Sequence, residues 1–190
     1  MVLQPLSAAD SARLWALDQR CFPPGIAYSE SEIRACLLQA ARGFHAAIGA
    51  TMDDGGDAPE LRPPAAFILS LLHRRRGHII TLDVAPEHRR RGLGWALMLA
   101  AEAHFRALGA VGMRLETAAD NQAARQFYAR LGYREMRALP DYYARGQHGL
   151  LLLKSLAEAR PPATSGSAPA KSGEPLDGSP RARKNALPRE

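Results

Sequence analysis

The chain has 190 residues and a net charge of +6, with 46% hydrophobic and 23% charged residues, as in an ordinary globular protein. This length suits one domain with some additional chain and is too short for two full domains. Two cysteines, Cys21 and Cys36, cannot supply a disulfide framework or a four-ligand zinc site. Because the sequence shows neither a signal-peptide pattern nor an apolar run of membrane-spanning length, we expect a reduced, cytoplasmic protein without a metal or a membrane association.

Hydrophobic periodicity predicts a succession of helices and strands along the chain. In chain order we expect a strand at 2–5, a helix at 7–20, a helix that follows a capping box at Ser29, strands at 44–50, 65–72 and 78–84, a helix at 92–108, a strand at 111–117, a helix at 121–131, and strands at 133–136 and 149–154. The capping box joins Ser29 to Glu32, three residues later, just before an apolar run. This order predicts an α/β domain with a mixed sheet.

Two segments lack this periodicity. Residues 52–64 combine glycine, aspartate and a double proline, which predicts a loop between two strands. Residues 161–190 contain six prolines and no aromatic residue, so they bury too little apolar surface to offset an ordering entropy of about 1–2 kcal/mol per residue. We therefore expect a folded domain over residues 1–160 and a disordered tail over residues 161–190.

A turn rich in arginine and glycine joins the expected strand at 78–84 to the helix that follows. Its sequence is Arg89-Arg90-Arg91-Gly92-Leu93-Gly94. A helix N-terminus carries unpaired N–H groups and a partial positive charge, and small glycines allow a pyrophosphate to approach this backbone. The sequence His-Arg-Arg-Arg-Gly also occurs at 73–77, where it runs into a strand, and there we expect a solvated hairpin turn.

Three segments in this part of the chain together resemble the motifs of one enzyme family. They are Leu82-Asp83-Val84 with Arg89-x-x-Gly92-x-Gly94, residues 115–124, and residues 127–133. They resemble the GNAT N-acetyltransferases, and within these the RimI-type and related protein N-terminal acetyltransferases. The resemblance is dense from about Ile79 to Tyr143 and thin before Ala65. It implies a mixed, mostly antiparallel sheet whose central strands splay apart, with flanking helices and acetyl-CoA as the co-substrate.

The resemblance also implies where acetyl-CoA binds. In this family the pantetheine arm adds to a strand edge through backbone groups, and the pyrophosphate takes N–H groups of the turn. The residues assigned to the coenzyme on this basis are Leu82, Asp83, Val84, Arg89, Arg90, Arg91, Gly92, Leu93, Gly94, Trp95 and Asn121. Asn121 has a second interpretation, because it also suits a helix cap.

Direct attack of an amine on a thioester needs a base for the amine proton and an acid for the leaving thiolate. By the resemblance, Glu116 aligns with the base of the RimI-type enzymes and Tyr128 with the acid. Glu116 is otherwise an ordinary carboxylate at a strand end, and a base that acts here through a water molecule is the alternative to direct transfer. Tyr128 lies on the apolar stripe of its helix and therefore also suits the core.

Four further residues are predicted to bind the acceptor, because their segments resemble the peptide-groove loops of N-terminal acetyltransferases. They are Phe22, Pro23, Tyr28 and Tyr142, the last of which belongs to the pair Tyr142-Tyr143 that resembles the family's tyrosine pair. Packing and turn formation are the alternative roles for these side chains. The segment 144–149 lacks the acidic pair of RimI-type enzymes, which leaves the acceptor and the role of His148 open.

The leading hypothesis is therefore an N-acetyltransferase that acts on a protein or peptide N-terminus, with ribosomal proteins among the candidate partners. Acetylation of a small amine, such as an amino acid or a polyamine, is the alternative within the same class. A non-catalytic acyl-CoA-binding or RNA-associated module is the alternative from another class, suggested by the basic turns and tail. Glu116 and Tyr128 together favour an enzyme, and we do not expect direct nucleic-acid binding.

Overall fold

The computed structural model describes residues 1–23, 26–41, 45–52 and 64–156. Most of the loop expected at 52–64 and the whole tail expected at 161–190 lie outside these residues. The elements, in chain order, are β1 (Val2–Pro5), the 3₁₀ turn η1 (Ala8–Asp10), α1 (Ser11–Cys21), α2 (Glu30–Gln39), β2 (His45–Thr51), β3 (Ala66–His73), β4 (Arg76–Val84), the 3₁₀ turn η4 (Pro86–His88), α3 (Leu93–Ala107), β5 (Gly112–Ala118), α4 (Gln122–Arg130), β6 (Arg134–Ala144) and β7 (Gln147–Ser155). Among the described helices, none is both long and apolar enough to cross a membrane.

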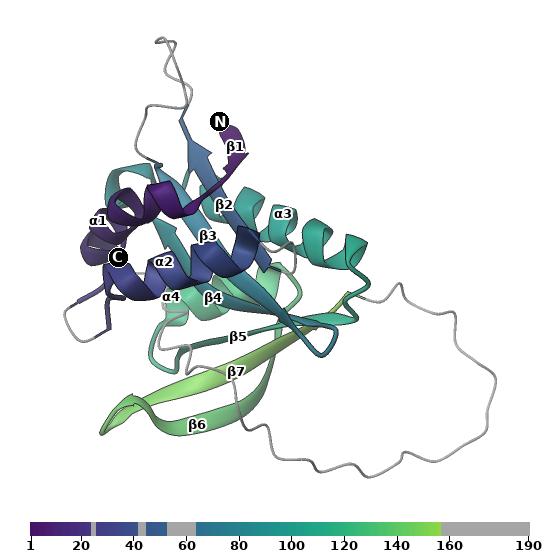
Figure 1. Ribbon diagram of the computed structural model, residues 1–190. Coiled ribbons are helices and arrows are strands. Elements are labelled where there is room, and N and C mark those ends of the chain that lie inside the picture. Colours follow the sequence, from purple (N-terminus) through teal and green to yellow (C-terminus); the bar gives the residue numbers. More distant parts are fainter. Residues whose placement is uncertain (24–25, 42–44, 53–63, 157–190) are drawn as a thin grey trace.

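The strands form one seven-stranded sheet in the order β1-β2-β3-β4-β5-β7-β6 (Figure 1). Every pairing is antiparallel except that between β4 and β5, which is parallel. The predicted mixed, mostly antiparallel sheet is thus confirmed, and the helices flank it as expected.

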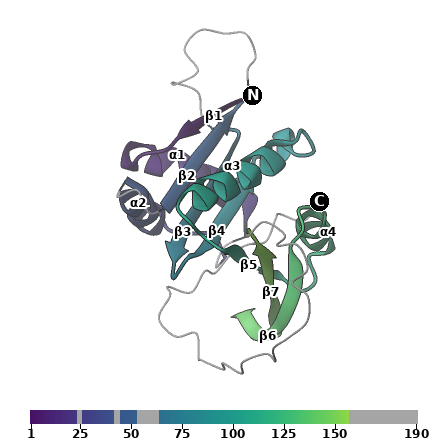
Figure 2. The same cartoon turned by 90° about the vertical axis from the view of Figure 1, so that its right-hand side faces the viewer.

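Helices cover both faces of the sheet, so each face has its own core (Figures 1 and 2). On one face α3 packs against β2, β3 and β4, and Leu97 and Phe105 are fully buried there. On the other face α1 and α2 contribute Leu14 and Leu37, which join Phe67 of β3 in a second buried cluster. The two cores hold the central strands firmly from both sides.

The capping box predicted at the start of α2 is present. The Ser29 hydroxyl accepts a hydrogen bond from the Glu32 amide at 3.3 Å, and the Ser29 amide donates to the Glu32 carboxylate at 2.9 Å. The box satisfies two backbone donors that the first turn of a helix leaves unpaired.

Replacing Ser29 with alanine is expected to lower the free energy of unfolding by about 1 kcal/mol. For a chain of this size, that loss lowers the melting temperature by about 2–4 °C. Ser31→Ala on the same turn is the matched control, because it keeps both bonds of the box. Equal melting temperatures for the two variants would show that the box contributes nothing to stability.

β6 is longer than the sequence predicted, extending to Ala144 instead of ending near Met136. It lies at the edge of the sheet, paired only with β7, and its side chains are mostly exposed along the whole strand. The register shifts between Leu139 and Ala144. Because such a strand buries neither face, it lacks the alternation of apolar and polar residues by which strands are predicted.

The two central parallel strands separate along their length. β4 and β5 pair only at Arg76–Gly112, Gly77–Met113 and His78–Arg114, after which β4 continues to Val84 and β5 to Ala118. Opposite β3, Thr81 pairs with Leu69 and Ile79 pairs with Ser70, so Ile80 forms a bulge at the point of separation. The splay expected from the resemblance is therefore present, and it opens at the carboxyl ends of the parallel strands, where α/β sheets bind ligands.

Candidate active site

The chain reverses direction between β4 and α3 through a turn that exposes the helix N-terminus. Gly92 caps the helix with φ +81°, a left-handed conformation that glycine adopts without steric cost. Since glycine offers no capping side chain, no side chain of the cap residue occupies the N–H groups of the first helical turn, which therefore suit an anion. The other His-Arg-Arg-Arg-Gly copy forms the exposed β3–β4 hairpin turn, with positive φ at Arg74 and Arg75, as predicted.

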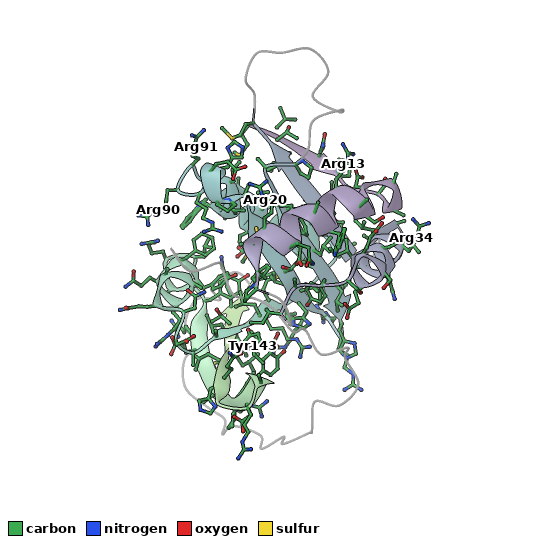
Figure 3. All side chains as sticks on the ribbon, turned by 90° about the vertical axis from the view of Figure 1, so that its left-hand side faces the viewer. Arg13, Arg20, Arg34, Arg90, Arg91 and Tyr143 are labelled. Atoms are coloured by element: carbon green, nitrogen blue, oxygen red, sulfur yellow. The ribbon has the colours of Figure 1, made fainter. Side chains whose placement is uncertain are left out.

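A pocket of about 270 Å³, which we call the outer pocket, lies against this turn. Its lining residues are Val84, His88, Arg89, Arg90, Gly92, Leu93, Gly94, Trp95, Ala123, Phe127 and Arg130. The structure thus brings most of the predicted coenzyme residues together. Four lie elsewhere: Leu82 and Asp83 are buried in β4, Asn121 lines a second cavity, and Arg91 is exposed beside the turn. Arg90 is exposed there too (Figure 3).

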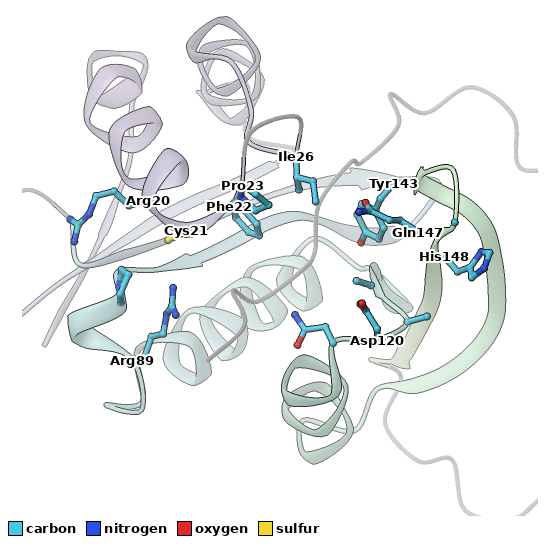
Figure 4. Close-up of a pocket in the computed structure, with 15 residues that line it drawn as sticks. Arg20, Cys21, Phe22, Pro23, Ile26, Arg89, Asp120, Tyr143, Gln147 and His148 are labelled. Carbon is cyan, nitrogen blue, oxygen red and sulfur yellow. The ribbon is translucent and has the colours of Figure 1, made fainter.

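A larger cavity of about 750 Å³, the central cavity, lies beside the splayed ends of the strands (Figure 4). Phe22, Pro23 and Ile26, from the α1–α2 loop, form one wall, and Tyr143 and Asp120 lie across from them. Arg89 lines both this cavity and the outer pocket, so it marks the junction of the two spaces.

Two of the four predicted acceptor residues do not line the central cavity. Tyr28 is 8% exposed and belongs to the core beneath α1 and α2, where its hydroxyl donates to the Ile80 carbonyl at 3.4 Å. The Tyr142 ring packs beside Gly149, and Tyr143 lines the cavity in its place. Successive side chains of a strand point to opposite faces of the sheet, so only one of two adjacent tyrosines in β6 faces the cavity.

Asn121 lies at the junction of β5 and α4 and lines the central cavity. Its side-chain oxygen accepts a hydrogen bond from the Ala124 amide at 3.0 Å and thereby caps α4. The cap interpretation is therefore correct, and the coenzyme contact of Asn121 stays a prediction.

Glu116 is buried and paired with a histidine that the sequence analysis did not single out. The His78 Nε2 and Glu116 Oε2 atoms are 2.7 Å apart, with side-chain exposures of 2% and 7%. Arg114 lies 3.1 Å from His78 Nδ1, and because a guanidinium only donates, Nδ1 is the acceptor. Nε2 therefore carries the proton and donates to the Glu116 carboxylate, so the three residues form the chain Arg114–His78–Glu116.

Tyr128 is fully buried beneath the splay, at the centre of an aromatic cluster. Its ring meets Phe127 and Tyr133 edge to face, with centroids 5.2 and 5.9 Å away. The hydroxyl has no hydrogen-bond partner among the described residues. Burial, together with the nearby Tyr143 and Asp83, raises the pKa of Tyr128, so the phenol keeps its proton.

The sequence profile of the acetyltransferase (GNAT) family matches residues 12–133, from α1 to the start of β6. The chain belongs to the GNAT acetyltransferase family. An uncharacterized N-acetyltransferase of Methanocaldococcus jannaschii is 37% identical over 97 residues, which cover 50% of this chain and 62% of that protein. An N-alpha-acetyltransferase of Sulfurisphaera tokodaii is 32% identical over 83 residues, which cover 43% of this chain and 50% of that protein. The chain thus spans roughly half to three fifths of the length of these curated relatives.

Solved structures share the fold of this GNAT protein over most of its length. The ribosomal-protein-S18-alanine N-acetyltransferase of Escherichia coli has a TM-score of 0.66 at 20% identity, covering 84% of this chain and 96% of that one. Ard1 of Thermoplasma volcanium has a TM-score of 0.68 at 21% identity, and the match covers 83% of this chain and 98% of that one. At these identities the likeness establishes the fold, which agrees with the family resemblance noted from the motifs.

The cysteine in the central cavity of this GNAT protein is not poised as a nucleophile. The Cys21 thiol donates to the Val84 carbonyl at 3.4 Å, and burial together with the charge of Asp83 raises the pKa of Cys21 to about 12. The thiol is therefore protonated at neutral pH, whereas thiolates are the reactive form. Among the described residues, no group of three or more His, Cys, Asp and Glu side chains could hold a metal ion.

Proposed function

We propose that this GNAT protein transfers the acetyl group of acetyl-CoA directly to the α-amino group of a protein N-terminus. The observation that carries the proposal is the position of the splay. It separates the Gly92 helix terminus, which suits a pyrophosphate, from a central cavity that suits an acceptor, and Glu116 and Tyr128 are buried next to it.

The residues present fit acetyl-CoA, which supplies the acetyl group as a thioester. Beyond His78 the edge of β4 no longer pairs with β5, so its backbone groups suit an extended pantetheine arm. The first turn of α3 offers N–H groups to the pyrophosphate. Arginines line the outer pocket and no carboxylate of the described residues does, which favours an anionic ligand.

Glu116 and Tyr128 suit the two proton transfers of a direct reaction. A carbon–nitrogen bond forms between the acetyl carbon and the neutral amine, and the carbon–sulfur bond breaks. Glu116 takes the proton that the amine loses, directly or through a water, while His78 holds the carboxylate in place as a positioning residue. Tyr128, whose raised pKa keeps its proton, donates it to the leaving sulfur. Glu116 then releases its proton to water and the tyrosinate takes one up from water, so no net proton is gained or lost.

Two observations support a peptide N-terminus as the acceptor: the shape and lining of the central cavity, and the names of related proteins. The central cavity is open, and Phe22, Pro23 and Tyr143 give it apolar walls that suit an extended peptide. Relatives from Sulfurisphaera tokodaii and Schizosaccharomyces pombe are named N-alpha-acetyltransferases. Both lines of support favour the N-terminus of a protein or peptide over a small amine.

Gly94→Asp is expected to weaken acetyl-CoA binding at least tenfold, which corresponds to about 1.4 kcal/mol. A Cβ at this position would lie 3.5 Å from Phe127 and 3.6 Å from Val84, so the helix accommodates the residue. The added carboxylate, however, stands against the pyrophosphate at the helix N-terminus. Isothermal titration calorimetry measures the loss.

The matched control is Ala103→Asp, which adds the same charge to an exposed position of α3 away from the outer pocket. Its affinity for acetyl-CoA should equal that of the wild type. Equal affinities for all three proteins would remove the coenzyme from this turn.

The proposed reaction is tested by thiol release from acetyl-CoA in the presence of different amines. We expect turnover with peptides that have a free N-terminus and none with the same peptides blocked at the N-terminus. Faster turnover with spermidine or free amino acids than with any peptide would contradict the acceptor class. The absence of thiol release with every amine would contradict the enzymatic function.

A further inference from the structure

Four arginines lie on the face of the sheet that also carries Glu116. Residues that pair directly across neighbouring strands point their side chains to the same side of a sheet. The register of β4, β5, β7 and β6 forms two adjacent rows of such residues, His78–Arg114–Leu153–Arg134 and Glu116–Leu151–Arg137. Two residues before His78, Arg76 lies on the same face, opposite Gly112. We call these four side chains the basic face: Arg76, Arg114, Arg134 and Arg137.

The basic face lies beyond the helices that cover this side of the sheet. α1 and α2 pack against β2, β3 and β4, whereas β5, β7 and β6 extend past them (Figure 1). Arg76, Arg134 and Arg137 are exposed, and none of them forms a hydrogen bond or an ion pair with a described residue. Their guanidinium groups are therefore available to a partner.

The carboxylates near these arginines do not neutralise them. Glu116 is the one carboxylate in the two rows and bonds to His78. Glu135 points to the opposite face of the sheet, where it pairs with Arg125 of α4. Asp141, further along β6, accepts the Gly146 amide at 2.6 Å within the β6–β7 turn. The basic face therefore has a net positive charge, which favours an anionic partner.

The basic face is also close enough to Glu116 for one extended peptide to contact both. Neighbouring strands lie about 4.8 Å apart, so the Arg137 backbone is about 10 Å from that of Glu116, two strands away. An extended peptide advances about 3.3 Å per residue. A peptide whose first amine lies at Glu116 therefore brings its third to fifth residues to Arg134 and Arg137.

We propose that the basic face binds acidic side chains at the third to fifth positions of the acceptor, and so selects N-termini that are followed by aspartate or glutamate. The inference rests on the proposed function, because the acceptor amine must first reach Glu116. Continuity with Glu116 favours a peptide over a nucleic acid as the partner. Charged side chains also protect an edge strand such as β6 from pairing with other chains, but that role does not require a single sign of charge on one face.

The test compares two peptides that share their first two residues, contain no lysine and have a free N-terminus. One carries Asp-Glu-Asp at positions three to five and the other Asn-Gln-Asn. We expect the KM of the acidic peptide to be about tenfold lower, because exposed ion pairs are weak singly and several act together here. The difference should shrink as the ionic strength rises, since salt screens exposed charges.

Substitutions on β6 then assign the preference to the basic face. Arg134→Gln combined with Arg137→Gln should raise the KM of the acidic peptide to that of the neutral one, and the loss should appear in KM rather than in kcat. Arg134→Glu combined with Arg137→Glu should instead favour a peptide with arginines at the same positions. The matched control, Arg34→Gln combined with Arg106→Gln, removes the same charge from exposed positions of α2 and α3 and should keep the wild-type preference. Circular dichroism confirms that each variant is folded.

Three outcomes overturn the inference and differ in what they imply. If the wild type acetylates both peptides with equal KM, or if the preference survives in the Arg134 and Arg137 variants, the inference fails and the proposed function stands. If the KM values are equal and a single-stranded RNA binds through these arginines, the basic face belongs to a nucleic acid instead. If neither peptide is acetylated, the proposed function fails and the inference fails with it.

Discussion

Replacing Tyr128 with phenylalanine is expected to lower turnover roughly 10²–10⁴-fold, the range typical of general acid catalysis. The affinity for acetyl-CoA should change little, because the interaction lost is made only as the thiolate leaves. Stability should not fall either. The hydroxyl is buried without a hydrogen-bond partner among the described residues, so its removal breaks no bond and leaves no cavity.

The measurement combines steady-state kinetics, calorimetry with acetyl-CoA and a thermal melt of the same variant. Tyr133→Phe is the matched control, since it also removes one phenol hydroxyl and its ring belongs to the same buried cluster, in edge-to-face contact with Tyr128. We expect this control to turn over normally. Normal turnover of Tyr128→Phe with a melting temperature several degrees lower would instead make Tyr128 a core residue without a chemical role.

Glu116→Gln is expected to lower turnover by a comparable factor, most strongly at low pH. An α-amino group has a pKa near 7.7–8.0, so below that pH most acceptor molecules carry the extra proton. Without the carboxylate the site loses its proposed base, and the rate should recover partly as the pH rises and free amine appears. The rate ratio of wild type to variant should therefore shrink between pH 6.5 and 9.

Glu135→Gln, an exposed carboxylate paired with Arg125, controls for the change of charge. His78→Gln tests the positioning role, since it removes the imidazole that orients Glu116. We expect His78→Gln to lower kcat with little change in KM for the peptide and to keep the wild-type pH profile more closely than Glu116→Gln. Parallel pH profiles for wild type and Glu116→Gln would exclude Glu116 as the base.

The elements predicted best are those with strong local signals. Ser29 and Glu32 specify the start of α2, and Gly92 specifies the start of α3, because capping and positive φ depend on residues close in sequence. β6 was predicted too short, since an exposed edge strand needs no apolar alternation. Local sequence signals therefore predicted the turn between β4 and α3 but not the length of the edge strand.

The residues that sequence reasoning missed depend on register between distant segments. His78 meets Glu116 because β4 and β5 align His78 with Arg114, and nothing in either strand alone fixes that alignment. Tyr28 and Tyr143 illustrate the same limit, because burial of the first and exposure of the second to the cavity follow from packing across the sheet. The resemblance supplied the fold and the family, while the Arg114–His78–Glu116 chain came from the structure.

The central claim, acetyl transfer to a protein N-terminus, is tested most directly by locating the acetyl group on a peptide that has both a free N-terminus and a lysine. The purified protein is incubated with acetyl-CoA and the peptide, and tandem mass spectrometry assigns the modified nitrogen. The account predicts acetylation of the α-amino group, with the lysine unmodified and the signal lost in Tyr128→Phe. Acetylation of the lysine alone, or equal modification in Tyr128→Phe, would contradict it.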